Sequence, residues 1–94
     1  MKITVDGITF DNNFYDEDAD VLYMHVGDPS TATDFTESVE GHAIRLDDQG
    51  AVVGITLVRP RYHIKRGDPL TVTPSWRDPI NIDPATLDLL LHAA

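Results

Sequence analysis

The stretch from residue 42 to residue 58 constrains the fold most, because it holds two complementary strand patterns joined by a turn. His42–Leu46 and Ala51–Val58 each alternate apolar with small or polar side chains, which is the period of a β-strand. Asp47–Gly50 lies between them and ends in a glycine, which suits the positive φ that follows a type I turn. The sequence therefore predicts an antiparallel hairpin at the centre of the fold.

Further strand patterns lie on both sides of this hairpin. Val21–Val26 alternates, and both of its faces are partly apolar, which favours a central strand or one whose second face is covered. The dipeptide Asp6-Gly7 favours a tight hairpin. The remaining expected strands are short: Lys2–Val5, Ile8–Phe10, Phe35–Val39 and Leu70–Thr73.

Two helices are expected. A proline near the start and a glycine after the end indicate a short helix near residues 60–66, with Tyr62 as its inward contact. A second helix near 84–92 follows Asp83, a good N-cap, and Pro84, which suits the first helical position. Leu87, Leu90 and Leu91 give it an apolar stripe, whereas Trp76 lies before it in a proline-bounded loop.

These elements predict an α+β domain with a small antiparallel sheet of about five strands. At 94 residues the chain is expected to form one domain, residues 1–94, in which residues 75–94 add the C-terminal helix to a core over 1–74. Because a small sheet leaves an apolar second face and free edges, we expect a homodimer that covers them.

Charge is distributed unevenly along the chain. Residues 1–50 hold 12 acidic and two basic residues, and residues 51–94 hold four acidic and five basic ones, which together give a net charge of -9. This acidity opposes nucleic-acid binding. The basic segment could still meet an acidic partner, or the acidic half of a second copy, through the partner-binding candidates Arg59, Arg61, Tyr62, Lys65 and Arg66. A solvated polar segment without a partner explains the same pattern.

Several classes of protein and site are not indicated. No apolar run approaches the roughly 18 residues of a membrane span, and no secretory signal opens the chain, so a cytoplasmic protein is expected. The absence of cysteine excludes disulfides and thiolate metal sites. Asp16, Asp18 and Asp20 alternate like the first ligands of a calcium loop, but Val21 replaces its glycine and Gly27 its closing glutamate. We expect neither a metal nor a cofactor.

Catalytic candidates are few. His25 and His42 lie on expected strands and could meet across the sheet, with Glu37 nearby. Such a cluster would suit general base chemistry in a small hydrolase or isomerase, although packed, hydrogen-bonded histidines explain the same pattern. Nucleophile and phosphate-loop motifs are absent.

The segment Tyr15–Met24, with Tyr-Asp, an acidic turn containing Ala-Asp and then a Leu-Tyr strand, resembles the signature of the bacterial family called domain of unknown function 2283. The resemblance covers about residues 1–74, and Thr56 departs from the carboxylate that short members often carry there. It implies a small antiparallel sheet with a helix and no established activity. Members are often encoded beside small toxin-like proteins, which implies an antitoxin or partner-binding role. The signature residues are Tyr15, Asp16, Asp20, Leu22 and Tyr23.

The signature also has a purely physical interpretation. Tyr15 can pack its ring against the turn while its hydroxyl finds an acceptor, and Asp16 and Asp20 can bind nearby backbone N–H groups. The leading hypothesis is thus a non-enzymatic protein-interaction or regulatory module. The hydrolase or isomerase, and a dimer that contacts DNA through residues 59–66, remain alternatives.

Overall fold

The computed structural model describes residues 2–93 and confirms a small α+β fold. Its main sheet has five antiparallel strands in the order β3-β4-β7-β6-β5. They are β3 (Asn12–Asp16), β4 (Val21–His25), β7 (Val52–Val58), β6 (Ala43–Leu46) and β5 (Asp34–Glu37).

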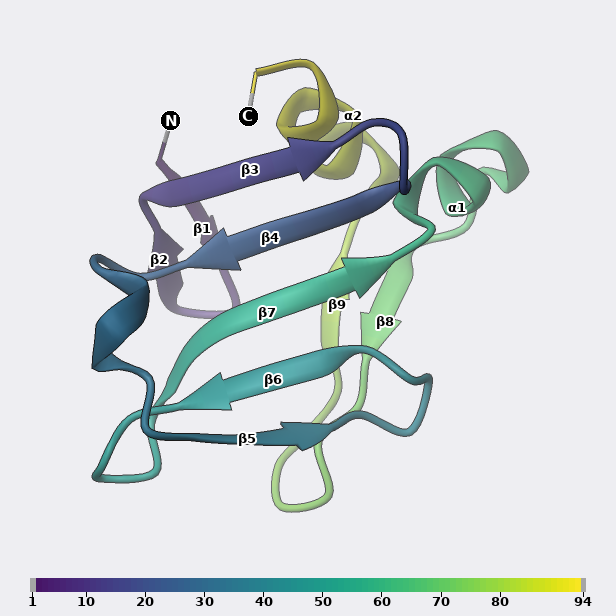
Figure 1. Ribbon diagram of the computed structural model, residues 1–94. Coiled ribbons are helices and arrows are strands. Elements are labelled where there is room, and N and C mark those ends of the chain that lie inside the picture. Colours follow the sequence, from purple (N-terminus) through teal and green to yellow (C-terminus); the bar gives the residue numbers. More distant parts are fainter. Residues whose placement is uncertain (1, 94) are drawn as a thin grey trace.

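Two hairpins and a helix form a second layer behind this sheet (Figure 1). The hairpins are β1 (Ile3–Val5) with β2 (Ile8–Phe10), and β8 (Leu70–Val72) with β9 (Ile80–Ile82). Helix α2 (Pro84–Ala93) lies behind the β3 end, whereas α1 (Pro60–Arg66) follows β7 at one end of the sheet (Figure 1). The short 3₁₀ helix η1 (Pro29–Thr31) links β4 to β5.

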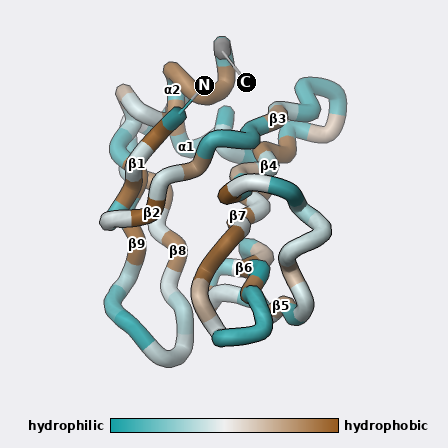
Figure 2. Tube along the Cα trace, turned by 90° about the vertical axis from the view of Figure 1, so that its left-hand side faces the viewer, coloured by the Kyte–Doolittle hydropathy of each residue, from teal (hydrophilic) through white to brown (hydrophobic). Residues whose placement is uncertain are grey.

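The core lies between the two layers, and the edge-on view of Figure 2 separates them. Leu22 and Met24 of β4 pair with Leu57 and Ile55 of β7, and all four side chains are buried on the inner face. From the second layer, fully buried side chains meet them: Phe10, Leu70, Val72, Ile80, Ile82, Leu87 and Leu90. Among the described residues, no second layer covers the other face of the sheet (Figures 1 and 2).

The two hairpins expected from their turn sequences form. Asp6 and Gly7 both have positive φ, 52° and 79°, which is the backbone of a two-residue type I′ turn. Gly50 has φ 79° at the end of the turn between β6 and β7. The strand expected at Val21–Val26 is β4, one residue shorter.

Helix α1 spans the expected residues, but the expected inward contact was wrong. Tyr62 is 49% exposed, and the helix turns Pro60 and Ile64 inward instead. The physical reason is helical spacing: Pro60 is buried where β7 enters the helix, and residues four positions apart share a face. Tyr62, two positions away, therefore faces solvent.

The C-terminal helix also forms as expected. Asp83 Oδ1 accepts a 2.7 Å hydrogen bond from the Thr86 backbone N–H, which is the predicted N-cap interaction. Ile82 and Leu87 are both buried on either side of this cap. Within residues 2–93, neither α1 nor α2 has the length and apolar composition of a membrane-crossing helix.

Candidate functional site

The acidic signature turn has a structural role, because its side chains form hydrogen bonds within the turn. The Tyr15 hydroxyl donates a 2.7 Å hydrogen bond to Asp20 Oδ1, and Asp16 Oδ1 accepts one of 3.2 Å from the Ala19 backbone N–H. Asp20 has φ 53°, a left-handed conformation that aspartate tolerates. Burial, reinforced by the neighbouring Asp20 carboxylate, raises the pKa of Tyr15 to about 12. Asp16 and Asp20 therefore bind backbone and hydroxyl groups of the chain itself.

Two other signature residues lie on opposite faces of β4. Leu22 is fully buried in the core, whereas Tyr23 is exposed on the uncovered face. There its ring stacks on Phe14 of β3, with the ring centroids 6.2 Å apart and the ring planes inclined by 22°. Leu22 thus specifies the fold, while Tyr23 is available for contact with another molecule.

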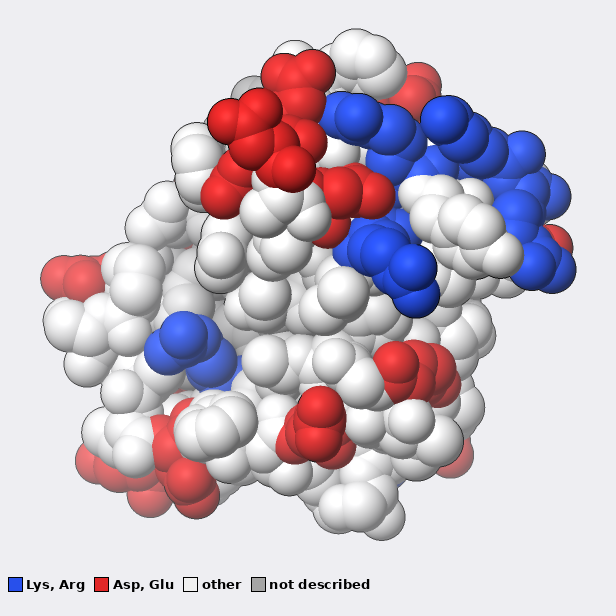
Figure 3. All heavy atoms as spheres, turned by 45° about the vertical axis from the view of Figure 1, so that its right-hand side comes forward, with Lys and Arg blue, Asp and Glu red and all other residues white. Residues whose placement is uncertain are grey.

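The basic residues of the segment 59–66 gather on one surface over α1 (Figure 3). We call this the α1 basic surface and define it by the five exposed residues Arg59, Arg61, Tyr62, Lys65 and Arg66. Its centre is Tyr62, because the guanidinium carbons of Arg59 and Arg66 lie 5.8 and 5.6 Å from its ring centroid. Arg66 Nη1 also donates a 3.0 Å hydrogen bond to the Tyr62 hydroxyl.

Some charges on the α1 basic surface are neutralised and others are not. Arg61 lies 3.7 Å from Glu17 and also over the Tyr15 ring, and Arg66 Nε pairs with Asp68 Oδ2 at 3.1 Å. Within residues 2–93, neither Arg59 nor Lys65 has a carboxylate partner. Arg59, which lies over the half-exposed Tyr62 ring, and Lys65 thus remain free to bind an anionic group.

His42 is buried beside this surface. Its Nδ1 accepts a 3.0 Å hydrogen bond from the Val58 backbone N–H, which assigns the proton of the neutral ring to Nε2. Burial is the main cause of the lowered pKa of His42. The nearby Glu40 raises this pKa, and His63 lowers it further. His42 is therefore a neutral structural acceptor at the end of β7.

Glu40 is also committed to a structural role. Its two carboxylate oxygens accept hydrogen bonds from the Thr73 backbone N–H and hydroxyl. Burial opposes ionisation of Glu40, but the bonds from Thr73 outweigh it and hold its pKa below the usual value. These two hydrogen bonds occupy the carboxylate and link the loop after β5 to the end of β8.

The catalytic candidates do not come together. Tyr23 pairs with Thr56, which pairs with Ala43, so His25 shares the face of Ala43 while His42 points to the other face. Glu37 also shares the face of Ala43, but β7 and β6 separate its strand from that of His25. Three strand spacings amount to about 14 Å, which is too far for a hydrogen bond. The described residues thus offer no histidine–carboxylate pair made from these three.

His25 is instead packed tightly into the sheet. Its Nδ1 lies 3.0 Å from the Val26 carbonyl oxygen, and its Nε2 is buried without a hydrogen-bond partner among the described residues. A Cβ placed on Gly54 would lie 2.7 Å from His25 Cδ2, which only glycine avoids. The ring therefore covers the backbone of the neighbouring strand.

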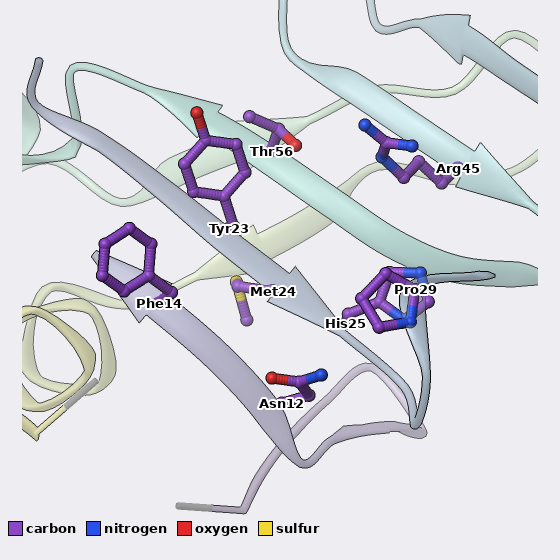
Figure 4. A pocket seen from close by; sticks show the side chains of 8 residues that line it. All are labelled: Asn12, Phe14, Tyr23, Met24, His25, Pro29, Arg45 and Thr56. Carbon is purple, nitrogen blue, oxygen red and sulfur yellow. The ribbon is translucent and has the colours of Figure 1, made fainter. Parts of the chain in front are cut away.

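A second candidate surface is the uncovered face of the main sheet. We call it the open sheet face and define it by the residues that the strand register places there and that are not buried: Asn12, Phe14, Asp16, Val21, Tyr23, Phe35, Glu37, Ala43, Arg45, Thr56 and Val58. Beside η1 it contains a hollow of about 270 Å³, and Phe14, Tyr23, His25 and Arg45 are among the residues that line it (Figure 4). Sequence reasoning expected a partly apolar second face but did not single out Phe14, Phe35 or Arg45.

Comparison with known proteins finds no matching family model, no similar curated protein and no similar solved structure. The resemblance of Tyr15–Met24 to domain of unknown function 2283 therefore stays a prediction. Among the described residues, no group of three or more histidine or carboxylate side chains is arranged to hold a metal ion.

Proposed function

We propose that this chain is a non-enzymatic protein-interaction module of the cytoplasm that binds an acidic protein partner through the α1 basic surface and acts as a homodimer. The observation that carries the partner proposal is Tyr62, half exposed and flanked by the guanidinium groups of Arg59 and Arg66. Tyrosine and arginine are the residues on which binding energy concentrates in protein interfaces. Because the hydrogen bond from Arg66 already holds the ring, less side-chain freedom is lost on binding.

Charge favours a polypeptide over a nucleic acid as the partner. The whole molecule carries a net charge of -9, and acidic residues lie directly beside the α1 basic surface (Figure 3). Of the four cations on the α1 basic surface, only Arg59 and Lys65 lack a carboxylate partner within residues 2–93. Binding to DNA depends on many simultaneous phosphate contacts, whereas one acidic loop needs only a few.

Nothing in the geometry favours the enzymatic alternative. His25, His42 and Glu37 do not form a cluster, and His42 is occupied as an acceptor for Val58. An antitoxin-like regulatory role is consistent with a compact module that offers a preorganised binding surface. A small toxin-like protein with an acidic surface is the partner we propose.

The experiment is co-expression of the chain with the product of the neighbouring gene, followed by a measurement of affinity on the purified complex. Lys65→Glu and Lys2→Glu are a matched pair, since each lowers the net charge by two and both side chains are exposed. We expect Lys65→Glu to weaken the complex about tenfold or more, because it places like charges opposite each other. Lys2→Glu should leave it unchanged.

The difference in affinity between Lys65→Glu and Lys2→Glu decides the result. Equal affinities for both, or no complex at all, would remove the α1 basic surface as the partner site. Salt-sensitive retardation of duplex DNA that Lys65→Glu abolishes would instead favour the DNA-contacting alternative.

A further inference from the structure

This inference rests on the proposal that the chain is a homodimer, and it assigns the interface. We propose that two copies associate through the open sheet face, with Arg45 of each copy paired to Glu37 of the other. The open sheet face lies on β3 to β7 and shares no residue with the α1 basic surface. The two proposals can therefore fail separately.

The first support is that four of the eight large hydrophobic side chains exposed within residues 2–93 gather on this one face. Phe35 is 70% exposed and Phe14 60%, and Tyr23 and Val58 are also exposed on the same face. On the opposite face of the same sheet, Leu22, Met24, Ile44, Ile55 and Leu57 are all buried. Exposed apolar groups that gather on one face mark a contact surface, and the stacked Phe14 and Tyr23 rings are already fixed in position.

The second support is the charge of this face. Two copies that each carry -9 repel one another wherever their acidic surfaces meet. The open sheet face has one cation, Arg45, and two anions, Glu37 and Asp16, so it carries a net charge of only -1. It is the surface on which two copies can approach with little electrostatic cost.

The third support is that Arg45 and Glu37 are unpaired. They lie on the neighbouring strands β6 and β5, where Phe35 is opposite Arg45 and Glu37 is opposite Ala43. Within residues 2–93, neither makes an ion pair or a side-chain hydrogen bond. In a two-fold interface a residue that contacts a second residue of the partner is contacted by it in return, so one Arg45–Glu37 contact generates two.

The size of the face sets the expected strength. Five strands of about five residues cover an area of about 24 by 17 Å. This area is smaller than the roughly 800 Å² that each partner buries in a standard interface. The dimer is therefore expected to be concentration-dependent, with a Kd on the order of micromolar.

The test is sedimentation equilibrium over a concentration series, with Arg45→Glu and Glu37→Arg as single variants. Each places like charges across the two-fold axis and should raise the Kd of the dimer about tenfold or more. An equimolar mixture of the two variants should form a heterodimer of wild-type strength, because every opposed pair is again attractive. The double variant Glu37→Arg/Arg45→Glu should also dimerise as wild type does.

Matched controls carry the same charge changes away from the face. Lys2→Glu and Asp48→Arg are exposed positions outside the open sheet face and should leave the Kd unchanged. If the single variants dimerise like wild type, the homodimer stands but its interface lies elsewhere. A wild-type chain that stays monomeric overturns both the homodimer and this interface. If the chain is monomeric and both single variants lose binding to the co-expressed partner, the open sheet face binds that partner instead.

Discussion

Asp20 joins the edge strand of the sheet to helix α1. Its Oδ1 accepts the Tyr15 hydroxyl at 2.7 Å and the Arg61 backbone N–H at 3.3 Å, and its carbonyl oxygen accepts the Arg59 backbone N–H at 2.9 Å. One aspartate thus fixes both the turn before β4 and the first turn of α1. This joint holds the α1 basic surface in its orientation beside the sheet.

Removing the Tyr15 hydroxyl should destabilise the fold. Tyr15→Phe removes the shorter of the two hydrogen bonds that Asp20 Oδ1 accepts, and we expect a loss of about 1–2 kcal/mol in the free energy of unfolding. Urea denaturation measures this loss. Tyr62→Phe is the control, because it removes a hydroxyl that is bonded only at the surface and should cost less than about 0.5 kcal/mol. Equal losses in both variants would show that the joint contributes nothing special.

The same hydroxyl predicts a pH dependence at alkaline pH. Because the folded protein raises the pKa of Tyr15 from 10.0 to about 12, the folded state holds this proton longer than the unfolded state does. The contribution to stability is complete below pH 10 and is lost as pH rises toward 12. Denaturation curves across this window should show the loss in wild type, and a smaller loss in Tyr15→Phe. Identical pH profiles would contradict the assignment.

His42 predicts a pH dependence of the opposite sign. Burial lowers its pKa below the ordinary 6.5, so the folded state binds this proton less readily than the unfolded chain. The stability it contributes is present above pH 6.5 and falls as pH drops below that value. His42→Asn keeps a side-chain acceptor for the Val58 N–H and should flatten the profile. The exposed His92→Asn should not, and a flattened profile in that control would refute the role of His42.

Gly54 and His25 should be energetically coupled. An added Cβ would lie 2.7 Å from the His25 ring, so we expect Gly54→Ala to destabilise the fold by about 1–3 kcal/mol. His25→Ala makes room for it, and the double variant should therefore be more stable than the sum of the single losses indicates. Denaturation of the four proteins gives the coupling directly. Strict additivity would mean that the ring moves aside at no cost.

Elements with strong local signals were predictable from the sequence. Pro60 with Gly67, and Asp83 with Pro84, delimit the two helices because they act through their own backbone and cap geometry. The tight turn at Asp6-Gly7 is equally local.

Features that depend on tertiary contact were not predictable. β3 begins with Asn12 and Asn13, which have low strand propensity, and it forms because it pairs with β4. β9 has only three residues and exists through its pairing with β8. The outward position of Tyr62 was not predictable either, because it depends on the burial of Pro60 where β7 meets α1, which is a property of the assembled fold.

The candidate site was predictable in part. The basic residues of α1 were visible as a cluster in the sequence, but their stacking on Tyr62 was not. The open sheet face required the register of five strands, since Phe14, Phe35 and Arg45 are far apart in the chain. Conversely, His25 and His42 could meet only if they shared a face of the sheet. They lie on opposite faces because the register places Ala43, the neighbour of His42, on the face of His25.

The central claim is that the chain acts through contacts between proteins, beginning with a second copy of itself. The most direct test is the mass of the wild-type chain in solution, measured by sedimentation equilibrium from about 5 µM to about 500 µM, a range that brackets a micromolar Kd. The mass should rise with concentration toward twice the 10.4 kDa of one chain. A mass that stays at 10.4 kDa over the whole range would contradict the claim.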